Sequence, residues 1–310
     1  MKRNTRVICL LVSVILPPAQ IRVQAQQRPN NQPAQAEPER VVLEFQVKKK
    51  GEFVGGLNKQ DISVFEDDVK QEITEFSEGD TPLSIVLLLD LSNSMKKSIR
   101  YVRERAQQIA QGIDPGDEVA LIRFATDVVL AQRFTTNKQE IANAISQAPN
   151  PGGYTTLNEA LREAAVYLTK SAAQGNRRVV IVFTDDEDTA SAAESLNQAS
   201  QAILNSGITV CGVLARASSR MTDLLPEGAV AKFVRQTAGV SLFIDDKRLG
   251  EQMTNVVGSL HRRYLIEYVP SNPKRNGKFR RLRLRLSPEA EKREGKLTIL
   301  AREGYFAPPR

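Results

Sequence analysis

The fold is decided by the stretch Ser84-Ile-Val-Leu-Leu-Leu-Asp90, which runs directly into Leu91-Ser92-Asn93-Ser94. The unbroken apolar run predicts a strand that is buried on both faces of a sheet. The Asp-x-Ser-x-Ser pattern at its end supplies one carboxylate and two hydroxyl groups. All three are hard oxygen donors, which suit Mg²⁺ better than zinc or copper. The stretch therefore indicates a buried strand that carries a cation site at its carboxyl end.

Two further segments carry matching features, in order along the chain. Gly152-Gly153-Tyr154-Thr155-Thr156-Leu157 is a glycine loop before a helical pattern, and Val179-Val-Ile-Val-Phe-Thr184-Asp185 is a second buried strand that ends in a carboxylate. With Asp-x-Ser-x-Ser, these segments resemble the metal-ion-dependent adhesion site (MIDAS) of von Willebrand factor A (VWA) domains. One such motif occurs often by chance, whereas three in order form a strong signal.

The resemblance implies five metal ligands, which are Asp90, Ser92, Ser94, Thr155 and Asp185. Because open α/β sheets bind ligands at the carboxyl ends of their strands, we expect Asp90 and Asp185 to converge. The implied cation is Mg²⁺, with Mn²⁺ or Ca²⁺ as alternatives. VWA domains complete the coordination of the ion with an acidic side chain of a partner protein. The simpler alternative is that Asp90 and Ser92 cap the following helix and that no metal binds.

The chain departs from the family pattern at three places. Asn93 stands where glycine is common, and asparagine tolerates unusual backbone angles. Tyr154 is an extra residue in the threonine loop, which leaves Thr156 as an alternative ligand. Asp186 replaces the usual glycine, and Glu187 and Asp188 follow it. These acids either strengthen cation binding and repel an acidic partner, or form a solvated loop.

The first 39 residues have the sequence features of an exported protein. Residues 1–25 show a basic start, an apolar middle from Val7 to Pro17 and a cleavage site at Val23-Gln24-Ala25, as in a secretory signal peptide. The apolar stretch is too short to span a bilayer comfortably. Residues 26–39, rich in Gln, Pro and Asn, indicate a flexible linker. We therefore expect a secreted, periplasmic or cell-envelope protein whose mature chain has no integral membrane span.

The charge and cysteine content of the chain limit the partners and the disulfide bonds that can be expected. Residues 1–25 hold four of the 43 basic residues and none of the 36 acidic ones, so the mature chain carries a net charge of +3 and no nucleic-acid partner is expected. The charge is uneven, since Arg262–Arg310 holds 14 basic and 5 acidic residues. Cys211 is the single cysteine after cleavage, which excludes an internal disulfide and predicts a buried strand residue. None of these features indicates an oligomeric state.

From Ser84 onward the sequence alternates buried strands with helical patterns. This rhythm is typical of a Rossmann-like, doubly wound α/β fold with a mostly parallel sheet. The expected strands are 84–90, 118–124, 178–184, 208–214 and 241–244, with 128–134 as an antiparallel edge. The first motif leads into a helix that ends at Gly112, and the other expected helices are 157–170, 190–206, 221–225, 231–237 and 247–261.

Short strand patterns on both sides of this core predict a small β domain to which both ends of the chain contribute. They lie at 41–47, 61–65 and 71–76 before the core, and at 264–269, 277–287 and 296–302 after it. The segments 51–76 and 264–308 are similar to those of a family of secreted bacterial VWA-related proteins. The predicted organisation is a signal peptide (1–25), a linker (26–39), an N-terminal β segment (40–79), a VWA domain (80–262) and a C-terminal β segment (263–310).

Arginine and leucine alternate from Arg281 to Leu286, which gives a strand with one basic and one apolar face. The basic face is either a patch for acidic glycans, phospholipid headgroups or an acidic partner, or a solvated sheet edge that discourages aggregation.

No catalytic constellation accompanies the candidate cation site. Hydrolases need a nucleophile with a positioned base, but the sequence has neither Gly-x-Ser-x-Gly nor a P-loop. The one histidine, His261, stands near a helix end and is expected at a surface or an interface. The predicted function is therefore Mg²⁺-dependent protein–protein binding or adhesion. The rivals are an assembly module of the cell envelope with a vestigial metal site, and a metal-dependent hydrolase that uses Asp185, Asp186 and Asp188.

Overall fold

The computed structural model describes residues 40–215, 228–244 and 246–309, which fall within a single compact unit. The expected signal peptide, the linker and the short helix at 221–225 lie outside the described residues. The described strands form three sheets, of six, five and four strands. No helix in these parts of the chain is both long and apolar enough to cross a membrane.

The central sheet has six strands, which are β6 (Leu83–Asp90), β7 (Glu118–Phe124), β8 (Val128–Thr135), β9 (Arg177–Thr184), β10 (Thr209–Leu214) and β11 (Ser241–Phe243). Their order is β11-β10-β9-β6-β7-β8, and all neighbours are parallel except β8, which pairs antiparallel with β7 at one edge. Every residue of β6 and β10 is buried, as expected for strands with both faces covered. The predicted mostly parallel sheet is therefore confirmed.

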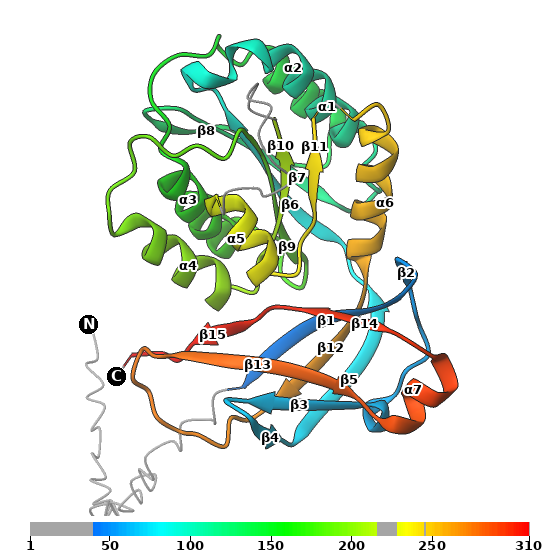
Figure 1. The fold of residues 1–310 in the computed structure, drawn as a ribbon. Coiled ribbons are helices and arrows are strands. Elements are labelled where there is room, and N and C mark those ends of the chain that lie inside the picture. Colours follow the sequence, from blue (N-terminus) through cyan, green and yellow to red (C-terminus); the bar gives the residue numbers. More distant parts are fainter. Residues whose placement is uncertain (1–39, 216–227, 245, 310) are drawn as a thin grey trace, which may run out of the picture. The chain divides into compact units, whose positions relative to one another are not determined.

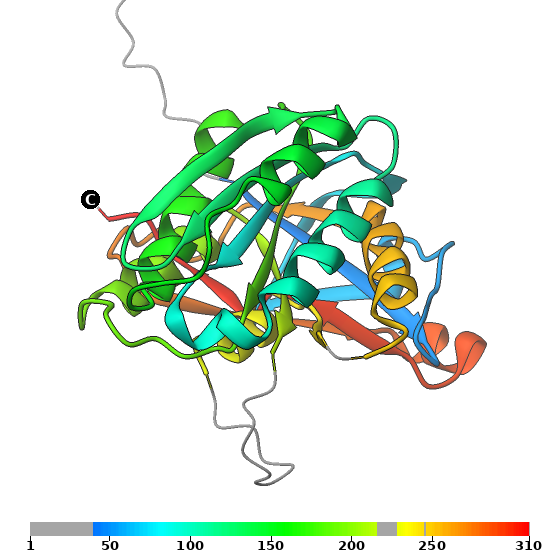
Figure 2. The same cartoon turned by 90° about the horizontal axis from the view of Figure 1, so that it is seen from above.

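Helices cover both faces of the central sheet (Figure 1), and these helices are α1 (Ile99–Gln111), α2 (Lys138–Ser146), α3 (Leu157–Ser171), α4 (Ser195–Asn205), α5 (Ala229–Gln236) and α6 (Leu249–His261). Helices α1, α2 and α6 pack against side chains such as Leu87, and α3, α4 and α5 pack against side chains such as Leu88. Successive strand residues point to opposite faces, so the apolar run of β6 feeds both cores. Figure 2 shows the same two layers from above. Helix α2 was not predicted, because only Ile141 and Ile145 of its residues are buried.

Two antiparallel sheets are built from the segments that flank this core in the sequence. Their strands are β1 (Val41–Lys49), β2 (Glu52–Phe53), β3 (Ile62–Glu66), β4 (Val69–Gln71), β5 (Ile73–Asp80), β12 (Arg262–Tyr268), β13 (Phe279–Leu286), β14 (Thr298–Ala301) and β15 (Gly304–Phe306). One sheet has the order β14-β1-β12-β5, with β2 on β1, and the other has the order β15-β13-β3-β4. Each sheet thus combines strands from both ends of the chain, as predicted. Two short helices, η1 (Lys59–Asp61) and α7 (Pro288–Glu294), connect these strands.

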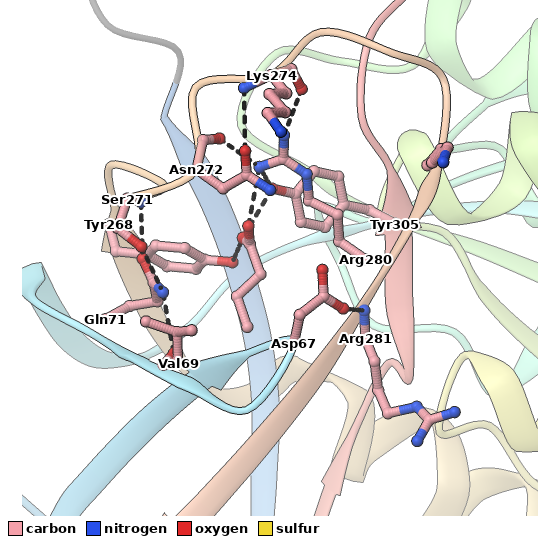
Figure 3. A network of polar contacts seen from close by, with 12 residues as sticks. Asp67, Val69, Gln71, Tyr268, Ser271, Asn272, Lys274, Arg280, Arg281 and Tyr305 are labelled. Carbon is pink, nitrogen blue, oxygen red and sulfur yellow. Dashed lines mark hydrogen bonds and ion pairs between the residues drawn. The ribbon is translucent and has the colours of Figure 1, made fainter.

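Within this β domain, hydrogen bonds and an ion pair of one buried carboxylate connect the N-terminal and C-terminal segments (Figure 3). Glu66, at the end of β3, accepts hydrogen bonds from the hydroxyls of Tyr268 and Tyr305 (2.8 Å each) and pairs with the Arg280 guanidinium (2.8 Å). Arg280 also donates to the Asn272 carbonyl (2.8 Å), which holds the loop before β13. Burial and the Glu66 carboxylate raise the pKa of both tyrosines, so their hydroxyls stay protonated as donors.

The arginine-rich strand β13 lies between β15 and β3 in the order of its sheet, but most of its alternating stretch pairs with a strand on one side only. Its first three residues pair with β15, and Leu282–Leu286 pair with β3. On the exposed face, Arg283 forms an ion pair with Asp68 (2.9 Å), and the Arg285 guanidinium lies 4.8 Å from the centre of the Phe65 ring. Intramolecular partners therefore occupy part of the basic face.

Candidate metal centre

The candidate ligands lie on loops at the carboxyl ends of β6 and β9 and before α3. Backbone hydrogen bonds join the first loop to the glycine loop, from the Gly152 amide to the Leu91 carbonyl (2.7 Å) and from the Asn93 amide to the Gly153 carbonyl (3.2 Å). Gly153 has a φ of +84°, and a Cβ at this position would meet the Thr126 hydroxyl at 2.5 Å. Glycine is required here because both the backbone angle and the close approach exclude a side chain.

Asp90 is fully buried at the centre of the site. Its Oδ1 accepts a hydrogen bond from the Ser92 amide (2.8 Å), and its Oδ2 accepts one from the Thr184 hydroxyl (2.7 Å). Burial raises the pKa of Asp90 to about 6 despite these hydrogen bonds, and the negative charge of Asp185 adds to the rise. Asp185 directly follows β9, which pairs with β6, so both carboxylates lie at the same edge of the sheet. The motif comparison assigned no role to Thr184, although it holds the orientation of Asp90.

The serine hydroxyls form a pair beside Asp90. Ser92 Oγ and Ser94 Oγ lie 3.0 Å apart, and Ser92 is almost fully buried. Ser92 occupies the N-cap position of the 3₁₀ helix η2 (Asn93–Lys97), but its side chain makes no capping hydrogen bond. The helix-capping alternative therefore does not account for the Ser92 hydroxyl, which faces its serine neighbour.

Thr155 joins the glycine loop to the segment that follows β9. Its carbonyl accepts hydrogen bonds from the amides of Thr189 (3.1 Å) and Ala190 (2.9 Å), and its amide donates to the Thr189 hydroxyl (3.0 Å). The Thr156 hydroxyl donates to the Ala125 carbonyl (2.7 Å), whereas the Thr155 hydroxyl makes no hydrogen bond to any described residue. The Thr155 hydroxyl is thus better placed than the Thr156 hydroxyl to act as a cation ligand, and the Thr156 hydroxyl stabilises the loop.

The acidic residues that follow β9 make different interactions. Asp185 is half-buried, and its Oδ1 accepts a hydrogen bond from the Glu187 amide (3.3 Å). Asp186 has a φ of +64° and accepts a hydrogen bond from the Val230 amide at the start of α5 (2.8 Å). Asp188 accepts a hydrogen bond from the Asn158 amide at the start of α3 (3.1 Å). Asp186 and Asp188 therefore stabilise helix N-termini, a role that neither sequence-based alternative included.

The donor set fits a hard divalent cation. Asp90 forms no ion pair with a lysine or arginine among the described residues, and a buried carboxylate without a counter-charge is unfavourable. Within the described chain no three Asp, Glu, His or Cys side chains form a metal-binding group, so a cation held by Asp90 and Asp185 would depend on hydroxyl oxygens for its other protein ligands. Such donors suit Mg²⁺, Mn²⁺ or Ca²⁺ and lack the nitrogen and sulfur ligands of a typical zinc site.

Comparisons with known proteins identify the domain. The model of the von Willebrand factor type A domain matches residues 84–227. None of the curated protein sequences compared with the chain matches it. Among solved structures, a von Willebrand factor type A protein from Catenulispora acidiphila is 13% identical, with a TM-score of 0.50, and the similarity covers 80% of this chain and 74% of that one.

Two further similarities each cover somewhat more than half of this chain. BatB, a conserved hypothetical protein from Bacteroides thetaiotaomicron, is 17% identical over 57% of this chain and 98% of its own, with a TM-score of 0.45. Proximal thread matrix protein 1 from the mussel byssus, in a form with a zinc-occupied MIDAS motif, is 16% identical over 58% of this chain and 48% of its own, with a TM-score of 0.46. At these identities only the fold is informative. The matched segment shows that the chain contains a von Willebrand factor type A domain, and the observed α/β architecture agrees with this assignment.

Proposed function

We propose that this protein is an exported binding module whose VWA domain holds Mg²⁺ and uses it to bind a partner protein. VWA domains are usually binding modules rather than catalysts, and many contain a MIDAS. The proposed ligands are Asp90, Ser92, Ser94, Thr155 and Asp185. The observation that carries the proposal is the fully buried Asp90, which has no cationic side-chain partner among the described residues and lies between loops joined by backbone hydrogen bonds.

A cation at this position would offset an unfavourable arrangement of charge. The negative charge of Asp185 disfavours the charged form of Asp90, and the Asp90 side chain is fully buried. Mg²⁺ takes oxygen donors and keeps some of its water, so five protein groups, some acting through water, leave a position for a partner. When bound, the ion would supply a strong, directional contact to an acidic side chain of that partner.

The surroundings of the centre favour an acidic partner over a neutral one. Lys96 and Lys97 are exposed on η2 directly after the serine ligands, and Tyr154 is 67% exposed on the glycine loop. The extra acids Asp186 and Asp188 repel such a partner less than their number suggests, because helix amides already bind their carboxylates. An exposed tyrosine beside a charged contact is also typical of the residues that anchor interfaces.

Export is supported by the sequence of residues 1–25, with its basic start, apolar middle and Val23-Gln24-Ala25 cleavage site. The partner would accordingly be met outside the cytoplasm, at the cell envelope or beyond it.

The rival functions have less support from the site. A hydrolase that uses Asp185, Asp186 and Asp188 would need carboxylates free to act, and those of Asp186 and Asp188 are hydrogen-bonded to helix amides. His261, which was expected at a surface or an interface, is bound to the Asp117 carboxylate (2.9 Å), and its side chain is 13% exposed. An assembly module with a vestigial metal site would keep its partner when the metal is removed, and this difference can be measured.

The test is partner capture from envelope and secreted fractions with the full chain, in Mg²⁺ and in EDTA. Asp90→Ala and Ser92→Ala would be compared with Asp68→Ala, which removes an exposed carboxylate of the β domain. Binding that requires Mg²⁺ and is lost only in the two site variants supports the proposal. Capture that persists in EDTA and in both site variants favours the assembly module, and turnover in a phosphatase and esterase screen favours the hydrolase.

A further inference from the structure

A second candidate site lies at the opposite end of the central sheet from the metal centre. A cavity of about 720 Å³ is lined by the residues that begin β9 and β10, by the start of β1 and by the last residues of the chain around β15. The metal centre lies at the carboxyl ends of the same parallel strands, so the two sites use opposite edges of the sheet. Exposed residues such as Arg40, Gly207 and Pro309 border the cavity and leave it open to solvent.

The charge of the cavity wall is strongly positive. Five arginines line it, namely Arg40, Arg177, Arg178, Arg263 and Arg302, against the single carboxylate of Glu44. Glu44 pairs with the Arg177 Nε (3.4 Å), and Arg40 pairs with Glu267 outside the cavity (3.6 Å). Three guanidinium groups therefore have no carboxylate partner among the described residues.

Two of these three groups bind a helix end. Arg178 donates to the Ser206 carbonyl (3.2 Å) and Arg302 to the Leu204 carbonyl (2.8 Å), both at the carboxyl end of α4. A helix carboxyl end carries about half a negative charge, so this contact balances only part of the two positive charges. The three positive charges less this half charge leave an excess of about 2.5 positive charges on the cavity wall.

Arg263 is the most informative of the three. It is only 3% exposed, its guanidinium donates no hydrogen bond to any described residue, and its Nη2 is a buried donor without an acceptor. Burial lowers the pKa of Arg263, Arg302 and Arg177, and the negative charge of Glu44 offsets only part of this effect. A buried, unpaired guanidinium costs several kcal/mol in general, which makes an additional anion favourable here.

We infer that this cavity binds a small organic anion, with a phosphate or carboxylate group near the arginines and an apolar portion against the remaining wall. Guanidinium groups match the planar and tetrahedral oxygens of these anions. The apolar wall comes from Val42, Ile208, Tyr305 and Pro308, and Val42 is an exposed hydrophobic side chain. The volume falls in the range of about 300–1,000 Å³ that is typical of small-molecule sites.

The test is calorimetric titration of the full chain with phenyl phosphate, benzoate, inorganic phosphate and phenol, at an ionic strength held constant with chloride. Comparing the affinities of phenyl phosphate and benzoate shows whether the site prefers a phosphate or a carboxylate group. Inorganic phosphate measures the contribution of the charged group to binding, and phenol measures that of the apolar ring. Arg178→Gln and Arg40→Gln remove charge at the cavity, and Arg281→Gln is the matched control on the exposed face of β13. Arg40 is exposed, so its variant keeps the test valid if Arg178→Gln fails to fold.

We expect one-site binding of phenyl phosphate or benzoate that is at least about tenfold weaker in the two cavity variants and unchanged in Arg281→Gln. Arg263→Met should not lower the melting temperature of the ligand-free protein, and should abolish the rise in melting temperature that the ligand produces. Absence of binding by all probes, or equal binding in cavity and control variants, would overturn the inference. A large loss of ligand-free stability in Arg263→Met would also overturn it, because the charge would then already be balanced.

Discussion

The orientation of Asp90 by Thr184 gives the sharpest test of how the candidate metal centre is built. Thr184→Val replaces the hydroxyl with a methyl group of similar size, so packing is retained. The variant loses the 2.7 Å hydrogen bond to Asp90 Oδ2 and also the acceptor of the Asp186 amide (3.1 Å). A hydrogen bond to a charged group contributes about 1.5–3 kcal/mol, and the metal-free variant should lose unfolding free energy in this range. Groups that orient metal ligands typically change metal affinity by about 10–100-fold. We therefore expect Mg²⁺ binding to weaken by that factor.

The assay combines urea unfolding with calorimetric titration of Mg²⁺ into EDTA-stripped protein. Thr184→Ser is the matched control, because it keeps the hydroxyl and removes only the methyl group. It should bind Mg²⁺ nearly as well as the unmodified protein. Equal Mg²⁺ affinity in Thr184→Val and the unmodified protein, or equal weakening in both variants, would refute the role assigned to this hydroxyl.

Three further predictions concern other parts of the molecule. Glu66→Gln should lower the unfolding free energy by about 3–5 kcal/mol in urea titrations, because the buried Arg280 loses its counter-ion; a loss below about 1 kcal/mol would contradict the proposed role of Glu66. The hydrogen bond to Asp117 raises the pKa of His261, so the stability lost in His261→Gln should be greatest below about pH 6.5 and should vanish as the pH rises through the raised pKa. Melting temperatures between pH 5.5 and 9 check this, and a pH-independent difference would exclude it. Asp186→Ala should cost about 1 kcal/mol through the lost cap of α5 while leaving Mg²⁺ affinity unchanged, and a parallel loss of Mg²⁺ binding would make Asp186 a ligand.

The strands of the central sheet were predictable because burial on both faces demands continuous apolar runs. Ser84–Asp90 and Ile208–Leu214 carry this signal, and they correspond to β6 and β10. Cys211 lies buried in β10, as its surroundings predicted. Helix α7 was missed because its one buried residue gives no periodicity, although Ser287 at the N-cap, Pro288 at the first position and Gly295 at the end signal a helix.

The positions of the candidate ligands at strand ends could be predicted from the motifs, whereas their contacts could not. Asp90 and Asp185 could be placed because strand ends define the edge of the sheet. The role of Asp186 could not, because α5 begins more than forty residues later and only the tertiary fold brings its amides to the carboxylate. The role of Thr184 could not be predicted for the same reason, since its partner Asp90 lies on a different strand. The position of β13 in the order of its sheet likewise depends on pairing with β3 and β15, which are distant and short.

The measurement that tests the central claim most directly is calorimetric titration of Mg²⁺ and Mn²⁺ into EDTA-stripped protein, alongside Asp90→Ala and the control Asp68→Ala. The account predicts one-site binding to the unmodified protein and to Asp68→Ala, and none to Asp90→Ala, which removes the buried carboxylate at the centre of the site. Absence of binding to the unmodified protein, or binding that survives Asp90→Ala, would contradict it.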